Sequence, residues 1–214
     1  MLGTSVCYKS IIQWYYKLRN VWSKRLRATP LKFEGTEVAS ITGESTVEID
    51  ESLFGKKAKN TRGTSCQKYS VFGIVEKNGR RCVLYYLRDH TRKTLFDIII
   101  RHVDTSCKIN HDGFAAYNSL GTIGYDHSVV FHNLEFVTPE GVHTNTIEGL
   151  WGLIKQRISR MHGLPSFESL AALLDEFSYR QIYSDGNGSI WQQLLADVEE
   201  LGSSVAEEDN QQNF

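Results

Sequence analysis

Three acidic residues of this 214-residue chain stand where carboxylates can act together. Asp50 lies inside a strand-like run, Asp112 follows a short strand, and Glu148 lies near the start of a long predicted helix. Carboxylate oxygens suit Mg²⁺, which keeps several waters for a substrate phosphate. A pair of such ions, typically about 3.5–4 Å apart, stabilises both the attacking and the leaving oxygen of an in-line displacement. The three acids therefore predict metal-dependent phosphodiester chemistry, without His or Cys ligands.

Asp50 also has a purely structural explanation. Alternate residues of a strand face opposite sides, so Asp50 shares a side with Phe54, while Glu51 faces the other way. A carboxylate on a covered side is costly unless it is paired or bound to a metal. An edge-strand acid that faces water is the competing interpretation, and Glu48 and Glu51 are neighbouring acids that compete for the same role.

The other two acids have structural explanations as well. Asp112 precedes a glycine, as a turn residue often does. If Asn145 is the N-cap of the long helix, Glu148 is the third helical residue, and the two form a capping box. Trp151 and Lys155 follow Glu148 at helical spacing on the same side, which a cap alone does not require.

The acids can meet only if the fold brings a strand, a strand end and a helix together. Apolar alternation predicts three strands, and the Asn-Gly pair between the second and third is a strong hairpin signal. The predicted order is strands at 46–54, 69–76 and 81–87, a helix at 94–103, a strand at 107–111, a helix at 114–120, a strand at 125–132, and helices at 144–161 and 167–181. Three antiparallel strands followed by alternating strands and helices form the ribonuclease H-like arrangement, an α/β fold with a mixed sheet.

The two ends of the chain differ in charge. Residues 1–32 carry seven Lys and Arg and no acid, and apolar spacing predicts a helix over 8–28. Its interleaved aromatic residues fit either nucleic-acid contact or packing against the main domain. Residues 196–214 carry six acids and no base. We therefore predict a basic helical segment at 1–34, a catalytic domain at 35–184, and an acidic, disordered tail at 185–214.

Composition narrows the class of protein. Hydrophobic residues make up 41% of the chain and charged residues 23%, which are globular values. No apolar run has the length of a membrane span, and the start of the chain does not read as a signal peptide. The four cysteines form no CxxC pair, so no zinc ribbon is expected, and scattered thiols suit a reducing compartment.

Several blocks of the sequence resemble the Merlin-type DDE transposases, which are eukaryotic relatives of the bacterial ISXO-type insertion-sequence transposases. The blocks are VEIDESLFGKK, VFGIVEKNG, HDGFAAYNSLGTIGYDHSVVFH and, above all, FVTPEGVHTNTIEGLWGLIK. The resemblance implies a catalytic and metal-binding triad of Asp50, Asp112 and Glu148, with two Mg²⁺ ions that Mn²⁺ can replace. Some bacterial relatives use Asn at the third position with a following Lys, which keeps Asn145 and Lys155 as accessory candidates.

The resemblance also implies a function and partners. The expected function is a DNA transposase that cleaves strands at transposon ends and transfers the 3′-hydroxyl to target DNA, acting as a homo-oligomer and without a membrane. It would act in the nucleus of a eukaryote or the cytoplasm of a bacterium. Candidate DNA contacts follow the first strand and lie on the long helix: Lys56, Lys57, Lys59, Arg62, Lys155, Arg157 and Arg160.

The chain departs from the family pattern in three ways. No zinc ribbon is expected, the acidic tail matches no block of the family, and His111 precedes the second acid where a small polar residue is more usual. These departures motivate a second hypothesis, a domesticated and catalytically inactive transposase that binds DNA or protein. A nuclease that cleaves without strand transfer would use the same carboxylates.

Overall fold

The computed structural model describes residues 7–35, 45–55, 68–130, 144–160, 166–184 and 190–211, with side chains up to residue 201. The chain divides into two compact units. We call Leu31–Ala171 the sheet unit, and Met1–Pro30 together with Ala172–Phe214 the helical unit. The predicted boundaries at 34/35 and 184/185 therefore differ from the observed division, whose second boundary falls inside a helix.

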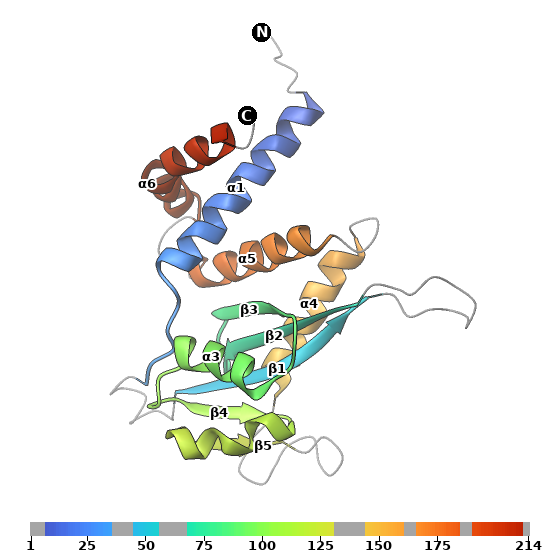
Figure 1. Cartoon of the computed structure of the whole chain (residues 1–214), viewed down its shortest axis with the longest axis vertical. Helices are drawn as coiled ribbons and strands as arrows, with labels where there is room; N and C mark the ends of the chain where they lie inside the picture. Colours follow the sequence, from blue (N-terminus) through green and yellow to red (C-terminus); the bar gives the residue numbers. More distant parts are fainter. Residues whose placement is uncertain are drawn as a thin grey trace, which may run out of the picture. The chain divides into compact units, whose positions relative to one another are not determined.

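The sheet unit is built on one five-stranded sheet (Figure 1). The strands are β1 (Thr46–Phe54), β2 (Tyr69–Glu76), β3 (Cys82–Leu87), β4 (Lys108–His111) and β5 (His127–Val129). Their order is β3-β2-β1-β4-β5, in which β1, β2 and β3 pair antiparallel. The later strands β4 and β5 run parallel to β1. This is the predicted ribonuclease H-like α/β arrangement with a mixed sheet.

The two faces of β1 have different neighbours, as strand alternation requires. Val47 and Ile49 belong to the main core, which also contains Leu95 and Ile99 of α3 (Arg92–His102). The opposite face of β1 and β2 packs against α4 (Asn145–Ser159). Asp50 and its neighbour Glu48 therefore point to the α4 side of the sheet.

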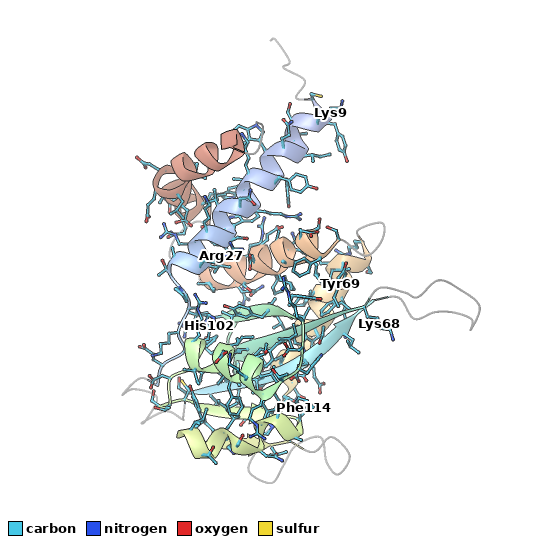
Figure 2. The ribbon with its side chains drawn as sticks, in the orientation of Figure 1. Lys9, Arg27, Lys68, Tyr69, His102 and Phe114 are labelled. Carbon is cyan, nitrogen blue, oxygen red and sulfur yellow. The ribbon has the colours of Figure 1, made fainter. Side chains whose placement is uncertain are left out.

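His102 shows how the core accommodates a polar ring (Figure 2). It is buried at the end of α3, where Nδ1 lies 2.6 Å from the Leu31 carbonyl oxygen and Nε2 lies 2.7 Å from the Tyr85 hydroxyl. Burial lowers the pKa of His102. Both ring nitrogens of His102 therefore have hydrogen-bond partners within the fold, which gives the ring a structural role.

Two predicted elements differ in kind or extent. The predicted helix at 114–120 is a 3₁₀ helix, η1, which spans Ala115–Ile123 and ends at Gly124 with φ of 93°. The predicted strand at 125–132 is described only as the short β5, and residues 131 and 132 lie outside the described residues. The predicted helix at 167–181 is α5, which spans Phe167–Tyr183.

The helical unit contains α1 (Tyr8–Ala28), the second half of α5 and α6 (Ile190–Gln211). Trp22 of α1, Tyr179 of α5 and Leu194 of α6 form its core. Helix α6 therefore covers residues 190–211 of the region predicted as an acidic tail. Its Asp197 is buried against Arg25, whose guanidinium lies 2.7 Å from Oδ1.

No helix within the described ranges has both the length and the hydropathy needed to cross a bilayer.

Candidate active site

The sheet places Asp50 and Asp112 at the same edge. In the parallel pairing of β1 with β4, Glu48 stands opposite Asn110. Two residues further on are Asp50, which is still in β1, and Asp112, which follows the end of β4, so the register directs both aspartates to the same end of this strand pair. Asp112 is exposed and follows β4 directly, where its Oδ1 accepts the Phe114 backbone N–H at 3.1 Å.

Asp50 lies in a half-buried, acidic environment. Its Oδ2 accepts a hydrogen bond from the indole Nε1 of Trp151 at 2.9 Å. Burial raises the pKa of Asp50 above its ordinary value, and the charges of Asp112 and Glu148 raise it further, while the Trp151 bond opposes the rise. Asp112 and Glu148 therefore both lie close enough to Asp50 to raise its pKa.

The start of α4 differs from the predicted capping box. Thr144 is the N-cap, and its side chain makes no capping hydrogen bond. The cap comes from the sheet instead, because the fully buried Glu48 accepts the Ile147 backbone N–H at 2.9 Å and the Thr146 hydroxyl at 3.0 Å. Glu148 consequently lies one residue deeper in the helix than a capping box requires.

The accessory candidates also lie on α4. Asn145 is the first helical residue rather than the N-cap, and it is exposed. Lys155 is exposed, and its Nζ lies 5.5 Å from the centroid of the Phe54 ring on β1. Arg157 is half-buried and Arg160 is exposed at the end of the helix. The other predicted DNA contacts lie outside the described residues: Lys56, Lys57, Lys59 and Arg62.

A metal ion at this site would have to be held by the carboxylates of Asp50, Asp112 and Glu148. Within the described ranges, no group of three or more His, Cys, Asp or Glu side chains is already arranged to hold one. Their carboxylate oxygens do suit a hard divalent cation. Asp112 and Glu148 are exposed acids, and their negative charges repel the negative charge of Asp50. A cation bound among these three carboxylates would relieve that repulsion.

A fourth acid, Glu51, borders the site although strand alternation turns it to the other face. Its Oε1 accepts the Tyr117 hydroxyl hydrogen bond at 2.5 Å. Burial raises the pKa of Glu51 to about 7, and the charges of Asp50 and Asp112 contribute to the rise. Sequence reasoning treated Glu51 only as a competitor of Asp50, and no sequence signal indicated its bond to Tyr117.

His111, the unusual residue before the second acid, supports the turn that carries Asp112. Its Nδ1 accepts the Gly113 backbone N–H at 3.1 Å, so the proton resides on Nε2, which lies 3.0 Å from Nδ1 of His127. Burial lowers the pKa of His111 to about 4, and the charge of His127 adds to this effect. The ring is thus a neutral, buried brace, and Gly113 next to it has φ of 84°.

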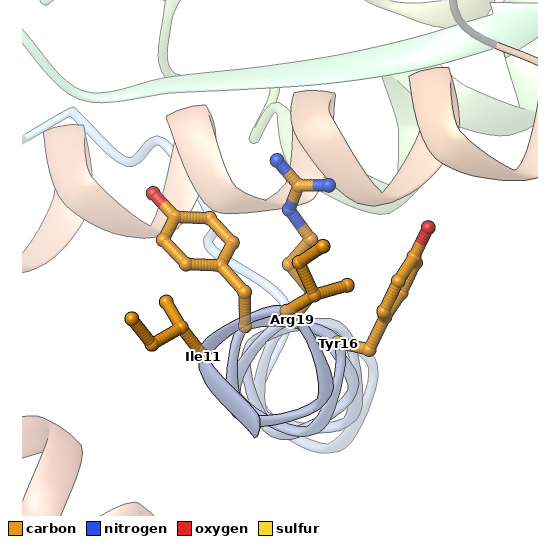
Figure 3. A pocket seen from close by; sticks show the side chains of 5 residues that line it. Ile11, Tyr16 and Arg19 are labelled. Carbon is orange, nitrogen blue, oxygen red and sulfur yellow. The ribbon is translucent and has the colours of Figure 1, made fainter. Parts of the chain in front are cut away.

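A separate pocket of about 290 Å³ lies along α1 in the helical unit (Figure 3). The side chains that line it are those of Ile11, Ile12, Tyr15, Tyr16 and Arg19. Its charged member, Arg19, donates from Nε to Glu176 at 3.2 Å. The pocket therefore lacks the acidic cluster on which metal-dependent chemistry would depend.

The order and the directions of the strands define a ribonuclease H-like domain. Residues 41–181 match the family described as the ISXO2-like transposase domain. Because this match covers well over half of the chain, the chain belongs to that family of DDE transposases. No curated protein matches the chain.

Among solved structures, the chain is similar to retroviral integrases. The catalytic core domain of BIV integrase is 13% identical, with 74% of this chain and 98% of that chain covered and a TM-score of 0.41. The HTLV-2 integrase catalytic core domain in complex with magnesium is 15% identical, with 76% and 95% covered and a TM-score of 0.38. The simian T-cell lymphotropic virus intasome in complex with PP2A regulatory subunit B56 gamma is 14% identical, with 78% and 55% covered and a TM-score of 0.40.

Proposed function

We propose that this chain is a DNA transposase that cleaves strands at transposon ends and transfers them to target DNA, with Asp50, Asp112 and Glu148 as its catalytic triad. The observation that supports the proposal is the parallel register of β1 and β4, which directs Asp50 and Asp112 to the same end of the two strands, together with the charges of Asp112 and Glu148, which raise the pKa of Asp50. Membership in the ISXO2-like family supports the same reaction. The sequence blocks quoted above favour a Merlin-type member.

The three carboxylates would hold two Mg²⁺ ions, for which Mn²⁺ can substitute. When bound, such ions lower the pKa of a water and stabilise charge on the attacking and leaving oxygens. The chain's own contribution is to hold the acids in place. Asp50 is fixed by Trp151, the Asp112 turn is braced by His111, and Glu148 is carried by a helix whose start is anchored to the sheet.

DNA and a second copy of the chain are the proposed partners. Lys155, Arg157 and Arg160 on α4 are the proposed phosphate contacts among the described residues, with Asn145 near the triad as an accessory group. Phosphate contacts make affinity fall steeply as salt rises, so a flat salt response would remove these residues from the interface. The proposed site of action is the nucleus in a eukaryotic host or the cytoplasm in a bacterial one.

The decisive experiment compares single carboxylate variants on DNA that carries the ends of the element encoding the chain. Labelled end DNA and a supercoiled target are incubated with purified protein and Mg²⁺ or Mn²⁺. We expect Asp50→Asn and Asp112→Asn to lose both cleavage and strand transfer, because each removes a metal-binding charge. Asp97→Asn, an exposed acid on α3 paired with Lys93, is the matched control and should remain active.

Intact activity in either triad variant would refute the assignment. Cleaved ends without joined products would instead indicate a nuclease that does not transfer strands.

A second candidate function is a DNA- or protein-binding module without catalysis. The observation that favours it is that the described residues hold no ready-made metal group. Calorimetric titration with Mn²⁺ separates the two functions. Two-site binding that Glu148→Gln abolishes supports the enzyme, whereas DNA binding that is indifferent to metal, in a chain that takes up none, supports the module.

A further inference from the structure

Two hydrogen bonds tie α4 to β1, and both involve carboxylates on the same face of the strand. Glu48 accepts the backbone N–H of Ile147, and Asp50 accepts the indole N–H of Trp151, each at 2.9 Å. Residues two apart on a strand are separated by about 6.6 Å. Residues four apart on a helix are separated by about 6 Å along its axis. The two spacings match, so the pair of bonds fixes the register of the helix on the strand.

The Trp151 ring packs against a glycine of β2, in space that a larger residue would fill. Gly73 of β2 stands directly opposite Asp50 in the antiparallel pairing. A Cβ atom at Gly73 would come within 2.7 Å of Cη2 of the Trp151 ring, a distance that real side chains do not allow. On its other flank, the ring meets Phe54 edge to face, with centroids 6.0 Å apart. The buried indole is therefore held in one orientation, with its N–H directed at Asp50.

The same helix carries the third acid. Glu148 lies three residues before Trp151, which places the two side chains on the same side of α4. A shift of the helix along the strand would therefore move Glu148 away from Asp50 and break the indole hydrogen bond at the same time. The bond between Trp151 and Asp50 links the first acid of the site to the third.

We propose that Trp151, seated on Gly73, is a positioning residue that orients the Asp50 carboxylate and keeps Glu148 within reach of it. This role rests on the proposed function, because it is a role in assembling the metal site. Partners that hold metal ligands from outside the coordination shell contribute about 10- to 100-fold to metal affinity. The indole N–H is such a partner for Asp50.

The test measures Mn²⁺ affinity by electron paramagnetic resonance of the free ion. Trp151→Phe keeps an apolar ring but removes the N–H, and we expect it to weaken Mn²⁺ binding by about 10-fold or more. Trp191→Phe, an exposed residue of the helical unit, is the matched control and should bind as the unaltered chain does. Val83→Ala, a core variant on the other side of the sheet, should lower stability without changing affinity.

Gly73→Ala gives an independent route to the same defect, because its methyl group displaces the ring. We expect a loss similar to that of Trp151→Phe, and little further loss when the two changes are combined, since both act on one hydrogen bond. Additive losses of Mn²⁺ affinity would contradict the proposed packing of Trp151 against Gly73.

A metal-free measurement tests the contact itself. In nuclear magnetic resonance spectra, the Trp151 indole N–H should exchange slowly with solvent and shift in Asp50→Asn, whereas the Trp191 indole should not. A Trp151 indole signal unaffected by Asp50→Asn would overturn the proposal.

The outcomes separate the two levels of inference. If Asp50→Asn loses Mn²⁺ binding while Trp151→Phe binds normally, the positioning role is wrong and the proposed function stands. If the unaltered chain binds no Mn²⁺, the proposed function fails and the positioning role fails with it.

Discussion

Acidic side chains are buried in both units of the molecule, but the charges around them differ. In the helical unit, Glu176 and Asp197 are both fully buried. Glu176 receives hydrogen bonds from Arg19 and Arg180, and Asp197 lies against Arg25. Each buried acid there is neutralised by a base of the same unit.

In the sheet unit, the neighbours that act on Asp50 are other acids. Asp112 and Glu148 raise its pKa, and Trp151, whose indole N–H donates a hydrogen bond to it, is neutral. Like charges that lie close together lower the stability of the fold, and a bound cation would restore it. The comparison distinguishes two uses of one residue type: an acid beside an arginine stabilises the fold, whereas acids beside one another form a candidate metal site.

The largest effect should come from removing a base in the helical unit. Arg25→Ala leaves Asp197 buried without its cation, and we expect the free energy of unfolding to fall by about 3–5 kcal/mol in urea titrations followed by circular dichroism. Lys93→Ala, which breaks an exposed pair with Asp97, should cost about 1 kcal/mol or less. Similar losses in the two variants would remove the distinction between buried and exposed pairs.

A metal ion should stabilise the sheet unit through its acids. At a Mn²⁺ concentration 100 times the dissociation constant, the free energy of unfolding should rise by about 2.7 kcal/mol. Asp50→Asn should abolish this gain, while Asp97→Asn should retain it, as measured by urea unfolding with and without Mn²⁺. An equal gain in Asp50→Asn would place the metal elsewhere.

The smallest effect concerns pH. The folded-state pKa of Glu51 is about 7, above its ordinary value of 4.5, so its protonated form favours folding. That contribution is fully present below pH 4.5 and is lost as pH rises through 7. Between pH 6.5 and 8, we therefore expect the free energy of unfolding to fall by about 1 kcal/mol or less, and Glu51→Gln to flatten the profile.

The pH window matters because His111 acts with the opposite sign. Its folded-state pKa is about 4, below the ordinary 6.5, so its contribution is present above pH 6.5 and is lost as pH falls toward 4. Between pH 6.5 and 8 the unfolded chain still releases part of the His111 proton, which offsets part of the Glu51 loss, so the difference between the unaltered chain and Glu51→Gln isolates the Glu51 effect. A profile that rises between pH 6.5 and 8 would contradict the Glu51 assignment.

Local sequence patterns predicted much of the fold. The strands 46–54 and 69–76 have the expected bounds because alternation and the Asn-Gly turn are properties of short segments, and Asn78 indeed adopts a positive φ of 59°. The antiparallel pairing of the first three strands and the mixed sheet also follow the prediction. The cap of α4 could not be predicted, because it comes from Glu48, which is 99 residues before Ile147. Nor could the burial of Asp197 on α6, which is paired with Arg25 of α1.

The site was predicted less completely than the fold. The sequence pointed to three candidate acids, but the pairing of β1 with β4, which directs Asp50 and Asp112 to the same end of the two strands, depends on contact between strands about 60 residues apart, which periodicity does not encode. Helical spacing places Trp151 on the Glu148 side of the helix. Its hydrogen bond to Asp50 could not be predicted in the same way, because the ring packs against Gly73 on a third element. In each case the missing information was a contact between residues that lie far apart in the sequence.

The anchoring of α4 by Glu48 also bears on when the site forms during folding. The helix receives this cap from a strand made 99 residues earlier, and contacts between distant residues close late because the intervening chain must first be ordered. The hairpin of β2 and β3, in contrast, is local. We therefore expect α4 to dock among the last steps of folding. A chain still emerging from the ribosome would hold Asp50 and Asp112 without Glu148, so the proposed metal site would stay incomplete until the fold is complete.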